Sequence, residues 1–305
     1  MKTHLPSTRT ERSEARLGWA FVAPALAVIL VIAFVPLVGT FWESLHLHDL
    51  RMPWLGRPFI GLANYGEALG DTRFWRSLGQ TAFFTAITVT VELALGLALA
   101  LALDRAYRGR GLVRLTVLLP WAIPTVVAAL VWRFIFESES GIANTLLLQL
   151  GLLGEPIVWL VHPLLAWVPI VLADVWKTTP FVALLLLAGL QNIDGALLEA
   201  ARMDGAGAWR RFREVTLPLL RPALLVALVF RTLDAFRVFD LIFVLTGGGP
   251  GTSTEPISLY TFNALLQQLR FGFGSALSVI VFGITFVLAL VYIRLLGASI
   301  TQDGR

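Results

Sequence analysis

The sequence predicts an all-α membrane protein with six transmembrane helices. The chain is 57% hydrophobic and 14% charged, whereas soluble domains carry about 25% charged residues. Six apolar stretches are long enough to span a bilayer, which takes about 20 residues per helical crossing. At this length and hydropathy a helix is the expected spanning element. The six stretches are residues 18–42, 78–103, 112–136, 164–190, 222–245 and 275–296.

These stretches divide the chain into three predicted parts. Residues 1–17 form an N-terminal tail, residues 18–297 a six-helix transmembrane domain, and residues 298–305 a C-terminal tail. A polar loop, residues 191–221, separates the fourth and fifth stretches. The first stretch is about 25 residues long and lacks a small-residue cleavage site at its end, so we expect it to be retained as a helix and not removed as a signal peptide.

Basic residues are distributed unequally between the two sides of the predicted membrane. Fifteen of the 24 lysines and arginines lie on the side of the termini and the polar loop, and five lie on the other side. The fifteen are Lys2, Arg9, Arg12, Arg16, Arg105, Arg108, Arg110, Arg114, Arg202, Arg210, Arg211, Arg213, Arg221, Arg294 and Arg305. The five are Arg51, Arg57, Arg73, Arg76 and Arg270. Cytoplasmic loops carry the basic excess, so both termini and the polar loop are predicted to be cytoplasmic.

Several functions are excluded by composition. The net charge of +4 follows from this topology, and no basic patch with interleaved aromatic residues indicates nucleic-acid binding. The chain has no cysteine, and its four histidines lack acidic partners at metal-ligand spacing, so no metal site is expected. Neither lysine, Lys2 or Lys177, follows a glycine as a nucleotide-binding P-loop requires. We therefore expect no catalytic residue on this chain.

The polar loop contains a compact motif. A helix over residues 197–203 presents Ala200 and Ala201 as a small, flat patch that lets another surface approach the backbone closely. Gly205 and Gly207 then permit a sharp turn. A basic second helix follows and leads into the fifth apolar stretch. The pattern predicts a docking element for another protein, with an ordinary interfacial amphipathic loop as the alternative.

The same residues resemble the EAA loop of bacterial ABC importer permeases. Glu199-Ala200-Ala201 is followed by Gly205 six residues after the glutamate and by Leu217-Pro218 about a dozen residues later. The resemblance implies that the loop docks in a cleft on a separate cytoplasmic P-loop ATPase, with ATP and magnesium bound there and no cofactor on this chain. The coupling residues it implies are Glu199, Ala200, Ala201, Asp204, Gly205, Ala206, Leu217 and Pro218.

Ionisable residues within the fifth stretch need a physical reason, because charge is costly inside a membrane. Arg231, Asp234, Arg237 and Asp240 alternate in sign at a spacing of three, which allows neighbours to pair on a helix. Successive steps of three drift by about −60°, so the four charges sweep across half the helix and favour a water-accessible interior face. Charged groups interleaved with aromatic Phe239 suit a sugar, whose hydroxyls need polar partners while its C–H faces stack on rings.

Two alternatives remain open at this point. In the first, the fifth-stretch charges fix helix packing by pairing with ionisable residues of other spans, namely Glu92, Asp174 and Lys177. We weigh pairing and a substrate pathway equally for the two arginines, favour the pathway for the two aspartates, and favour a buried pairing role for Glu92. In the second, Glu92 and Asp174 relay protons in a secondary carrier. An inert structural subunit is a more remote interpretation.

A further resemblance covers nearly all of the chain from the first span onward. Residues 176–181, 184–190, 231–240 and 245–250 are similar to segments of sugar permeases of the maltose and trehalose type. The resemblance implies the type I ABC importer permease fold, in a bacterial inner membrane. The partners it implies are a second permease, expected to be a distinct chain although a second copy is not excluded, two copies of the ATPase and an extracytoplasmic sugar-binding protein.

The same resemblance directs attention to a sugar site, for a disaccharide such as trehalose or maltose. The implied substrate-binding residues are Arg231, Asp234, Arg237, Phe239, Asp240, Trp176 and Lys177. For Trp176 and Lys177 a second interpretation is equally favoured. The turn that ends at Pro180 can be a helix kink, with Lys177 hydrogen-bonded to carbonyls freed by the proline.

Overall fold

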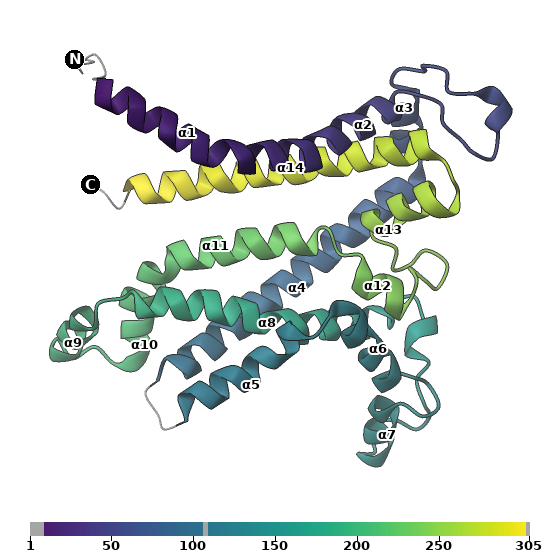
Figure 1. Ribbon diagram of the computed structural model, residues 1–305. Helices are drawn as coiled ribbons and strands as arrows, with labels where there is room; N and C mark the ends of the chain where they lie inside the picture. The colour runs from purple at the N-terminus through teal and green to yellow at the C-terminus, as the bar shows by residue number, and fades with distance from the viewer. Residues whose placement is uncertain (1–8, 106–108, 303–305) are drawn as a thin grey trace. The chain divides into compact units, whose positions relative to one another are not determined.

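A computed structural model describes residues 9–105 and 109–302, and in these ranges the regular elements are helices (Figure 1). The all-α prediction is therefore confirmed. The chain divides into two compact units. The first comprises Met1–Ala68 with Ala264–Val279, and the second comprises Leu69–Asn263 with Ile280–Arg305.

The first unit contains a long apolar helix and, after it, a segment of short helices and turns that begins at residue 45. α1 (Arg9–Ile29), a π-helical turn (Leu30–Phe34) and α2 (Val35–Ser44) follow one another without a break. This helix begins inside the predicted N-terminal tail. The unit also contains a short 3-10 helix (Pro53–Leu55), most of α3 (Ala63–Gly70), and the start of α14 (Phe271–Gln302).

Side-chain contacts hold together the segment that follows α2 in the first unit. The amide nitrogen of Asn64 donates to the carbonyl oxygens of Ser44 at 2.8 Å and His46 at 3.0 Å. Arg270 donates to Glu67 at 2.6 Å. These contacts tie the start of α3 to the end of α2 and to the residues that precede α14.

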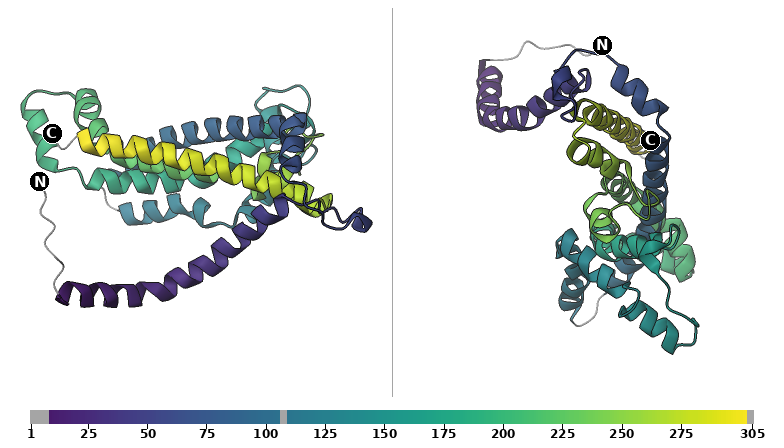
Figure 2. Two further views of the ribbon diagram at one scale, coloured as in Figure 1. Left: turned by 90° about the horizontal axis from the view of Figure 1, so that it is seen from above. Right: turned by 90° about the vertical axis from the view of Figure 1, so that its right-hand side faces the viewer.

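The second unit contains the remaining helices. They are α4 (Thr72–Asp104), α5 (Arg110–Ala122), α6 (Thr125–Ile135), α7 (Ile142–Gln149), α8 (Trp167–Gln191), α9 (Gly195–Met203), α10 (Ala208–Arg211), α11 (Leu217–Ala235), α12 (Asp240–Leu245) and α13 (Ile257–Phe262), with the later part of α14. α4, α8 and α11 pack against one another. α9 and α10 lie at one end of α8 and α11, and α6, α7 and α12 lie toward the other (Figures 1 and 2).

Five helical segments in the described ranges are long and apolar enough to cross a membrane. They are Leu17–Ser44, Thr72–Asp104, Trp167–Gln191, Ala208–Ala235 and Phe271–Arg294. The pair α5 and α6 passes the same test together, although it bends by 90°. Counted as one span, the bent pair completes the six spans that the sequence predicts.

The bend corrects the prediction of one straight helix over residues 112–136. α5 stops at Ala122, and Ile123 adopts an extended conformation with φ −72° and ψ 131°. Pro124 explains this change, because proline disfavours helical geometry at the preceding residue and has no N–H to donate.

The fifth span also differs from its prediction. A helix runs from Ala208 through a π-helical turn (Phe212–Thr216) to Ala235, and α12 begins separately at Asp240. The expectation that Arg231 and Asp240 share one helix is therefore wrong. No proline or glycine lies between Ala235 and Asp240, but the Ser258 hydroxyl donates to the carbonyl of Val238. This contact gives that carbonyl a partner outside a helix.

Two buried apolar clusters form the core of the second unit. One lies among α4, α6, α8, α12 and α13 and includes Phe84, Ile170 and Ile242. The other lies among α4, α8 and α11 toward the α9–α10 end and includes Leu186 and Leu220. Between the two clusters, each of α4, α8 and α11 has a short stretch that belongs to neither cluster. Ionisable side chains lie in these stretches.

Close approach of α4 and α8 depends on a residue without a side chain. A Cβ atom on Gly96 would lie 2.5 Å from Cγ1 of Val182. Glycine at this position lets the helix backbones approach closely, as small residues do at membrane helix interfaces.

Candidate functional site

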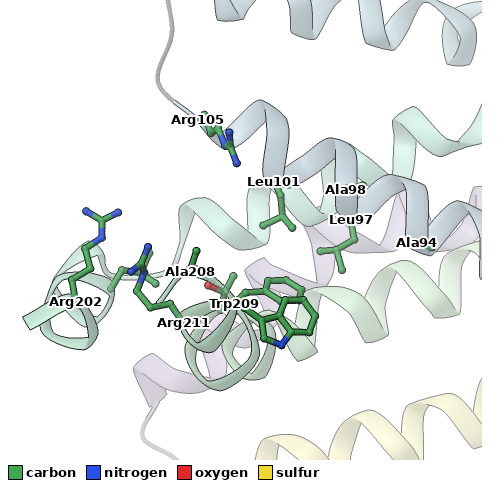
Figure 3. Close-up of a pocket in the computed structure, with 12 residues that line it drawn as sticks. Ala94, Leu97, Ala98, Leu101, Arg105, Arg202, Ala208, Trp209 and Arg211 are labelled. Atoms are coloured by element: carbon green, nitrogen blue, oxygen red, sulfur yellow. The ribbon is translucent and has the colours of Figure 1, made fainter. Parts of the chain in front are cut away.

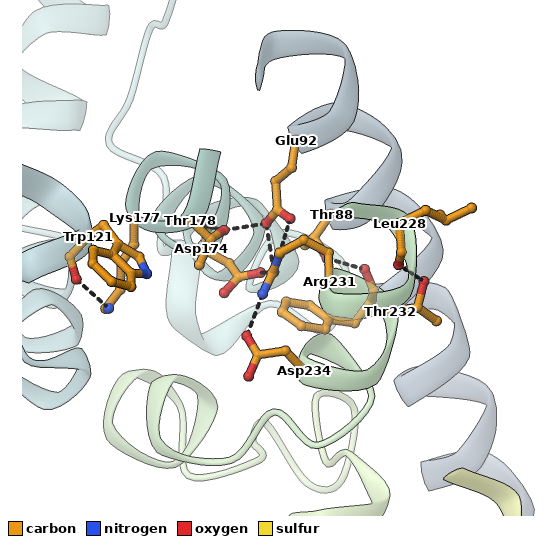
Figure 4. Close-up of polar contacts among 11 residues, drawn as sticks. Thr88, Glu92, Trp121, Asp174, Lys177, Thr178, Leu228, Arg231, Thr232 and Asp234 are labelled. Carbon is orange, nitrogen blue, oxygen red and sulfur yellow. Dashed lines mark hydrogen bonds and ion pairs between the residues drawn. The ribbon is translucent and has the colours of Figure 1, made fainter. Parts of the chain in front are cut away.

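A buried arginine lies at the centre of the second unit. Arg231 of α11 is 2% exposed. Its guanidinium binds both carboxylate oxygens of Glu92, with Nε 2.5 Å from Oε2 and Nη2 2.9 Å from Oε1 (Figure 4). Nη2 also lies 3.2 Å from Oδ2 of Asp174, and Nη1 lies 2.5 Å from Oδ2 of Asp234. One guanidinium thus joins α4, α8 and α11.

A threonine completes this buried cluster. Oγ1 of Thr178 lies 2.5 Å from Oε1 of Glu92 and 2.6 Å from the carbonyl oxygen of Asp174, so its hydroxyl can donate to either. Glu92 is fully buried. It is the buried partner that the sequence analysis favoured. Because charge-assisted bidentate bonds are strong and directional, this pairing fixes the register of the three helices.

Asp234 differs from the other members of the cluster. Its side chain is 67% exposed, although one of its oxygens contacts Arg231. Arg237, in the turn after α11, is also exposed and forms no ion pair with Asp240 within the described residues. The predicted neutralisation is therefore limited to Arg231 and Asp234, and the remaining polar groups are available to a ligand.

Two adjoining cavities open beside the cluster. Their volumes are about 290 Å³ and 380 Å³. Trp121, Thr178, Arg231, Asp234 and Arg237 line both cavities. The predicted substrate residues that line the first cavity are Arg231, Asp234, Arg237, Phe239, Asp240 and Lys177. The structure thus brings together six of the seven predicted substrate residues.

Trp176 is the exception. It does not line either cavity and instead packs edge-on against Trp132, with ring centroids 6.0 Å apart. Lys177, by contrast, lines the first cavity, and its Nζ lies 3.5 Å from the carbonyl oxygen of Trp121. That carbonyl loses its helical partner because α5 stops at Ala122. Lys177 therefore contacts a carbonyl that lacks a helical partner, as predicted. The carbonyl lies at the break between α5 and α6, however, and not at Pro180.

Aromatic residues outside the predicted set complete the cavity walls. Trp121 stacks on Phe181 with ring centroids 5.7 Å apart and an interplanar angle of 20°. Phe181 and Phe230 line the second cavity, and Thr125 lines the first. Trp121 and Phe230 carry no charge or motif that would have distinguished them in the sequence.

The cavities combine rings with charged donors and acceptors. Ligand cavities in proteins commonly measure about 300–1,000 Å³ and place a few polar groups among apolar walls. Arg237 and Lys177 offer donors, Asp234 and Asp240 offer acceptors, and Trp121 offers a ring face. This arrangement can bind a small polyhydroxylated molecule, whose hydroxyls both donate and accept.

The EAA-like loop forms the helix–turn–helix that its sequence predicts. Asp194 is the N-cap residue of α9, and its Oδ1 accepts a hydrogen bond from the backbone nitrogen of Ala196 at 2.9 Å. Glu199 and Ala200 are exposed. Gly205 then reverses the chain with φ +76°, a conformation that glycine adopts at little cost.

Backbone contacts stabilise this turn. The nitrogen of Ala206 donates to the carbonyl of Ala201 at 2.9 Å. The guanidinium of Arg211 donates to the carbonyl of Ala206 at 2.7 Å. Asp204 is the C-cap residue of α9 and is exposed. The predicted coupling residues up to Ala206 thus lie on α9 and the turn that follows it; Glu199, Ala200, Asp204 and Gly205 are exposed, and Ala201 and Ala206 are half-buried.

Leu217 and Pro218 are the first residues of α11 and directly follow the π-helical turn Phe212–Thr216. Since the helix is continuous from Ala208 to Ala235, the loop and Arg231 share one element.

Comparison with known protein families gives a match over most of the chain. Residues 92–300 match the family described as the binding-protein-dependent transport system inner membrane component. The chain belongs to this family. It is thus the permease subunit of an ABC importer, and ATP hydrolysis in such systems belongs to a separate subunit. The family assignment decides against the proton-coupled carrier.

Similar proteins match over almost the whole length of the permease. It is 45% identical to a trehalose/maltose transport system permease protein of Thermococcus litoralis, over 94% of this chain and 96% of that one. It is 44% identical to a trehalose transport system permease protein of Mycobacterium tuberculosis, over 96% and 92% of the two chains. A crystal structure of a bacterial ABC transporter that imports alginate superposes with a TM-score of 0.82 at 23% identity, covering 95% of this chain and 99% of that chain. The fold is that of an ABC importer permease.

We predict that Arg231→Gln destabilises the permease strongly, whereas Arg237→Gln does not. Removing one partner of a buried ion pair leaves an uncompensated buried charge and costs about 3–5 kcal/mol. The exposed Arg237 side chain carries no such penalty. The measurement is the apparent melting temperature of each purified variant in detergent. Equal melting temperatures for the two variants would show that the buried cluster does not stabilise the fold.

Proposed function

We propose that this permease carries a neutral disaccharide of the trehalose or maltose type through the two cavities beside Arg231. The observation that carries the proposal is that exposed Asp234, exposed Arg237 and Trp121 line both cavities, while Phe181, on which Trp121 stacks, lines the second. Disaccharide hydroxyls pair with the charged groups, and the sugar ring stacks on an aromatic face. The names of the two relatives above support this choice of sugar.

The charge pattern also supports a neutral ligand. Arginine and lysine alone would favour an acidic sugar, but Asp234 and Asp240 face the first cavity as well. Carboxylates near the ligand repel an anionic sugar. The cavity therefore suits a neutral, hydroxyl-rich molecule better than an acidic polysaccharide such as alginate.

The proposed orientation has both termini and the α9–α10 loop in the cytoplasm. The positive excess on that side supports it. α4 then begins outside at Thr72 and reaches the cytoplasmic surface at Asp104. In this orientation, loop 191–221 is accessible to a cytoplasmic ATPase.

The proposed assembly contains a second permease, two copies of the ATPase and an extracytoplasmic sugar-binding protein. ATP and Mg²⁺ bind to the ATPases, and this chain holds no cofactor. The family description names dependence on a binding protein. A crystal structure of the alginate transporter contains an alginate pentasaccharide-bound periplasmic protein. A distinct second permease is the preferred arrangement, with a second copy of this chain as the alternative.

In the proposed mechanism, the loop converts movement of the ATPases into movement of the cavity wall. Ala200 and Ala201 admit the ATPase surface closely, and Glu199 makes a polar contact with it. Closure of the ATPases around ATP then displaces α9 and α10. Because Ala208–Ala235 is one helix, the displacement reaches Asp234 at its far end and changes access to the sugar.

We predict that Arg237→Gln and Trp121→Leu each raise the KM for trehalose uptake by about tenfold or more. A hydrogen bond to a charged group contributes about 1.5–3 kcal/mol, and a tenfold change corresponds to about 1.4 kcal/mol. Uptake of radiolabelled trehalose into cells that express the complete transporter measures the effect. Arg76→Gln, at the outer end of α4, is the matched control. An unchanged KM in both cavity variants would remove the cavity from the sugar pathway.

We predict that Glu199→Lys and Gly205→Asp uncouple ATP hydrolysis from uptake without preventing membrane insertion. The first reverses the charge that contacts the ATPase, and the second places a side chain and a charge on a turn with φ +76°. Gly111→Asp adds the same side chain to another exposed segment of the same membrane side and should preserve uptake. The ratio of sugar transported to ATP hydrolysed in proteoliposomes measures coupling. Normal ratios in both loop variants would contradict the docking role.

A further inference from the structure

A large hollow lies between α4 and the α9–α10 segment, away from the sugar cavities. Its volume is about 590 Å³. Figure 3 shows α4 above it and Trp209 and Ala208 below, with Arg105 at the end of α4 and Arg202 and Arg211 across the hollow from it. The lining residues are Ala94, Leu97, Ala98, Leu101, Arg105, Leu198, Arg202, Ala208, Trp209, Arg211, Phe212 and Thr216. We call this hollow the interfacial pocket.

One wall of the interfacial pocket is an apolar stripe on α4. Ala94, Leu97, Ala98 and Leu101 follow the i, i+3, i+4, i+7 spacing of one helix face. At 1.5 Å per residue the stripe extends for about 10 Å from the loop end into the membrane-spanning part of α4. The two alanines leave room between the leucines, so the stripe forms a shallow groove.

The open end of the interfacial pocket is strongly basic. Arg105, Arg202 and Arg211 line it, and none of its lining residues is acidic. The guanidinium of Arg211 donates to the carbonyl of Ala206, but the side chains of Arg105 and Arg202 form no hydrogen bond or ion pair within the described residues. Three guanidinium groups without a carboxylate are complementary to a phosphate, which accepts hydrogen bonds from several of them.

We propose that the interfacial pocket binds an anionic phospholipid, with its phosphate among the three arginines and an acyl chain along the α4 stripe. Basic pockets between membrane helices on the cytoplasmic side bind anionic lipid headgroups. Trp209, which is 71% exposed, adds an aromatic residue of the kind found at membrane interfaces. The apolar groove beside the basic end distinguishes a lipid from a free phosphate ion.

The bound lipid would connect two elements that move relative to each other. Arg105 belongs to the end of α4, whereas Arg202 and Arg211 belong to α9 and α10. A phosphate that contacts all three therefore braces the docking turn against α4. This role goes beyond the proposed sugar transport, and it makes coupling sensitive to the lipid composition of the membrane.

The test uses the transporter complex, as purified with this chain, in nanodiscs of phosphatidylcholine that contain a small fraction of photoactivatable phosphatidylglycerol. After illumination, mass spectrometry locates the labelled peptides. We expect labelling within residues 94–105 and 198–216, and a fall of about tenfold or more in the variant Arg105→Gln/Arg202→Gln/Arg211→Gln. A nanodisc offers lipid on both faces, so the result does not depend on the proposed orientation or sugar.

Two further variants separate the proposal from general effects. Arg210→Gln/Arg213→Gln/Arg221→Gln removes the same charge from the same loop without altering the pocket lining, and it should keep full labelling. Ala98→Trp fills the exposed groove without a charge change and should also reduce labelling, which keeps the test valid if the triple pocket variant does not fold.

Three results would overturn the proposal. The first is equal labelling of the pocket variants and the control. The second is complete loss of labelling in excess inorganic phosphate at constant ionic strength, which would identify a free-anion site. The third is the absence of pocket labelling in the complex, which would mean that a protein partner covers the pocket.

Discussion

The buried guanidinium of Arg231 imposes the constraint on which the second unit depends. A charge at this depth must be paired, and its partners come from two other helices, Glu92 on α4 and Asp174 on α8. The apolar clusters on either side can pack in many registers, because dispersion contacts are not directional. The bidentate Arg231–Glu92 contact selects one register, and thereby also determines where the cavity lies.

The same arginine lies on the helix that runs from the α9–α10 loop to the cavity. Asp234 contacts the guanidinium of Arg231, but two thirds of its side chain is exposed and it lines the cavity. Arg231 lies on the helix that begins at Ala208 in the docking turn. A single helix therefore carries the loop's second half, the structural arginine and one wall of the cavity, and the proposed coupling between loop and cavity rests on this continuity.

The sequence predicts the local features of this fold better than its long-range ones. The turn at Gly205 depends on residues within one segment, and it forms as expected. The charge series beyond Ala235 was assigned to one straight helix because nothing in the local sequence interrupts it. The break between α11 and α12 includes a hydrogen bond from Ser258 to the Val238 carbonyl. The hydrophobic periodicity of the sequence cannot reveal such a long-range contact.

The cavity shows the same distinction. Five of the six predicted residues that meet there are charged, and charge inside a membrane is rare and informative. Trp121 and Phe230 were missed because aromatic residues are common in apolar helices and carry no such signal. Trp176 was included because residues 176–181 resemble a segment of sugar permeases, yet neighbouring residues on a helix point about 100° apart, and Trp176 packs against Trp132 instead.

The most direct test of the central claim is a cryo-electron microscopy structure of the complete transporter, trapped with trehalose and a non-hydrolysable ATP analogue. The account predicts sugar density in contact with Asp234 and Arg237, beside Trp121, with Arg231 still bound to Glu92. Sugar bound elsewhere, with this cavity empty in the trapped state, would contradict it.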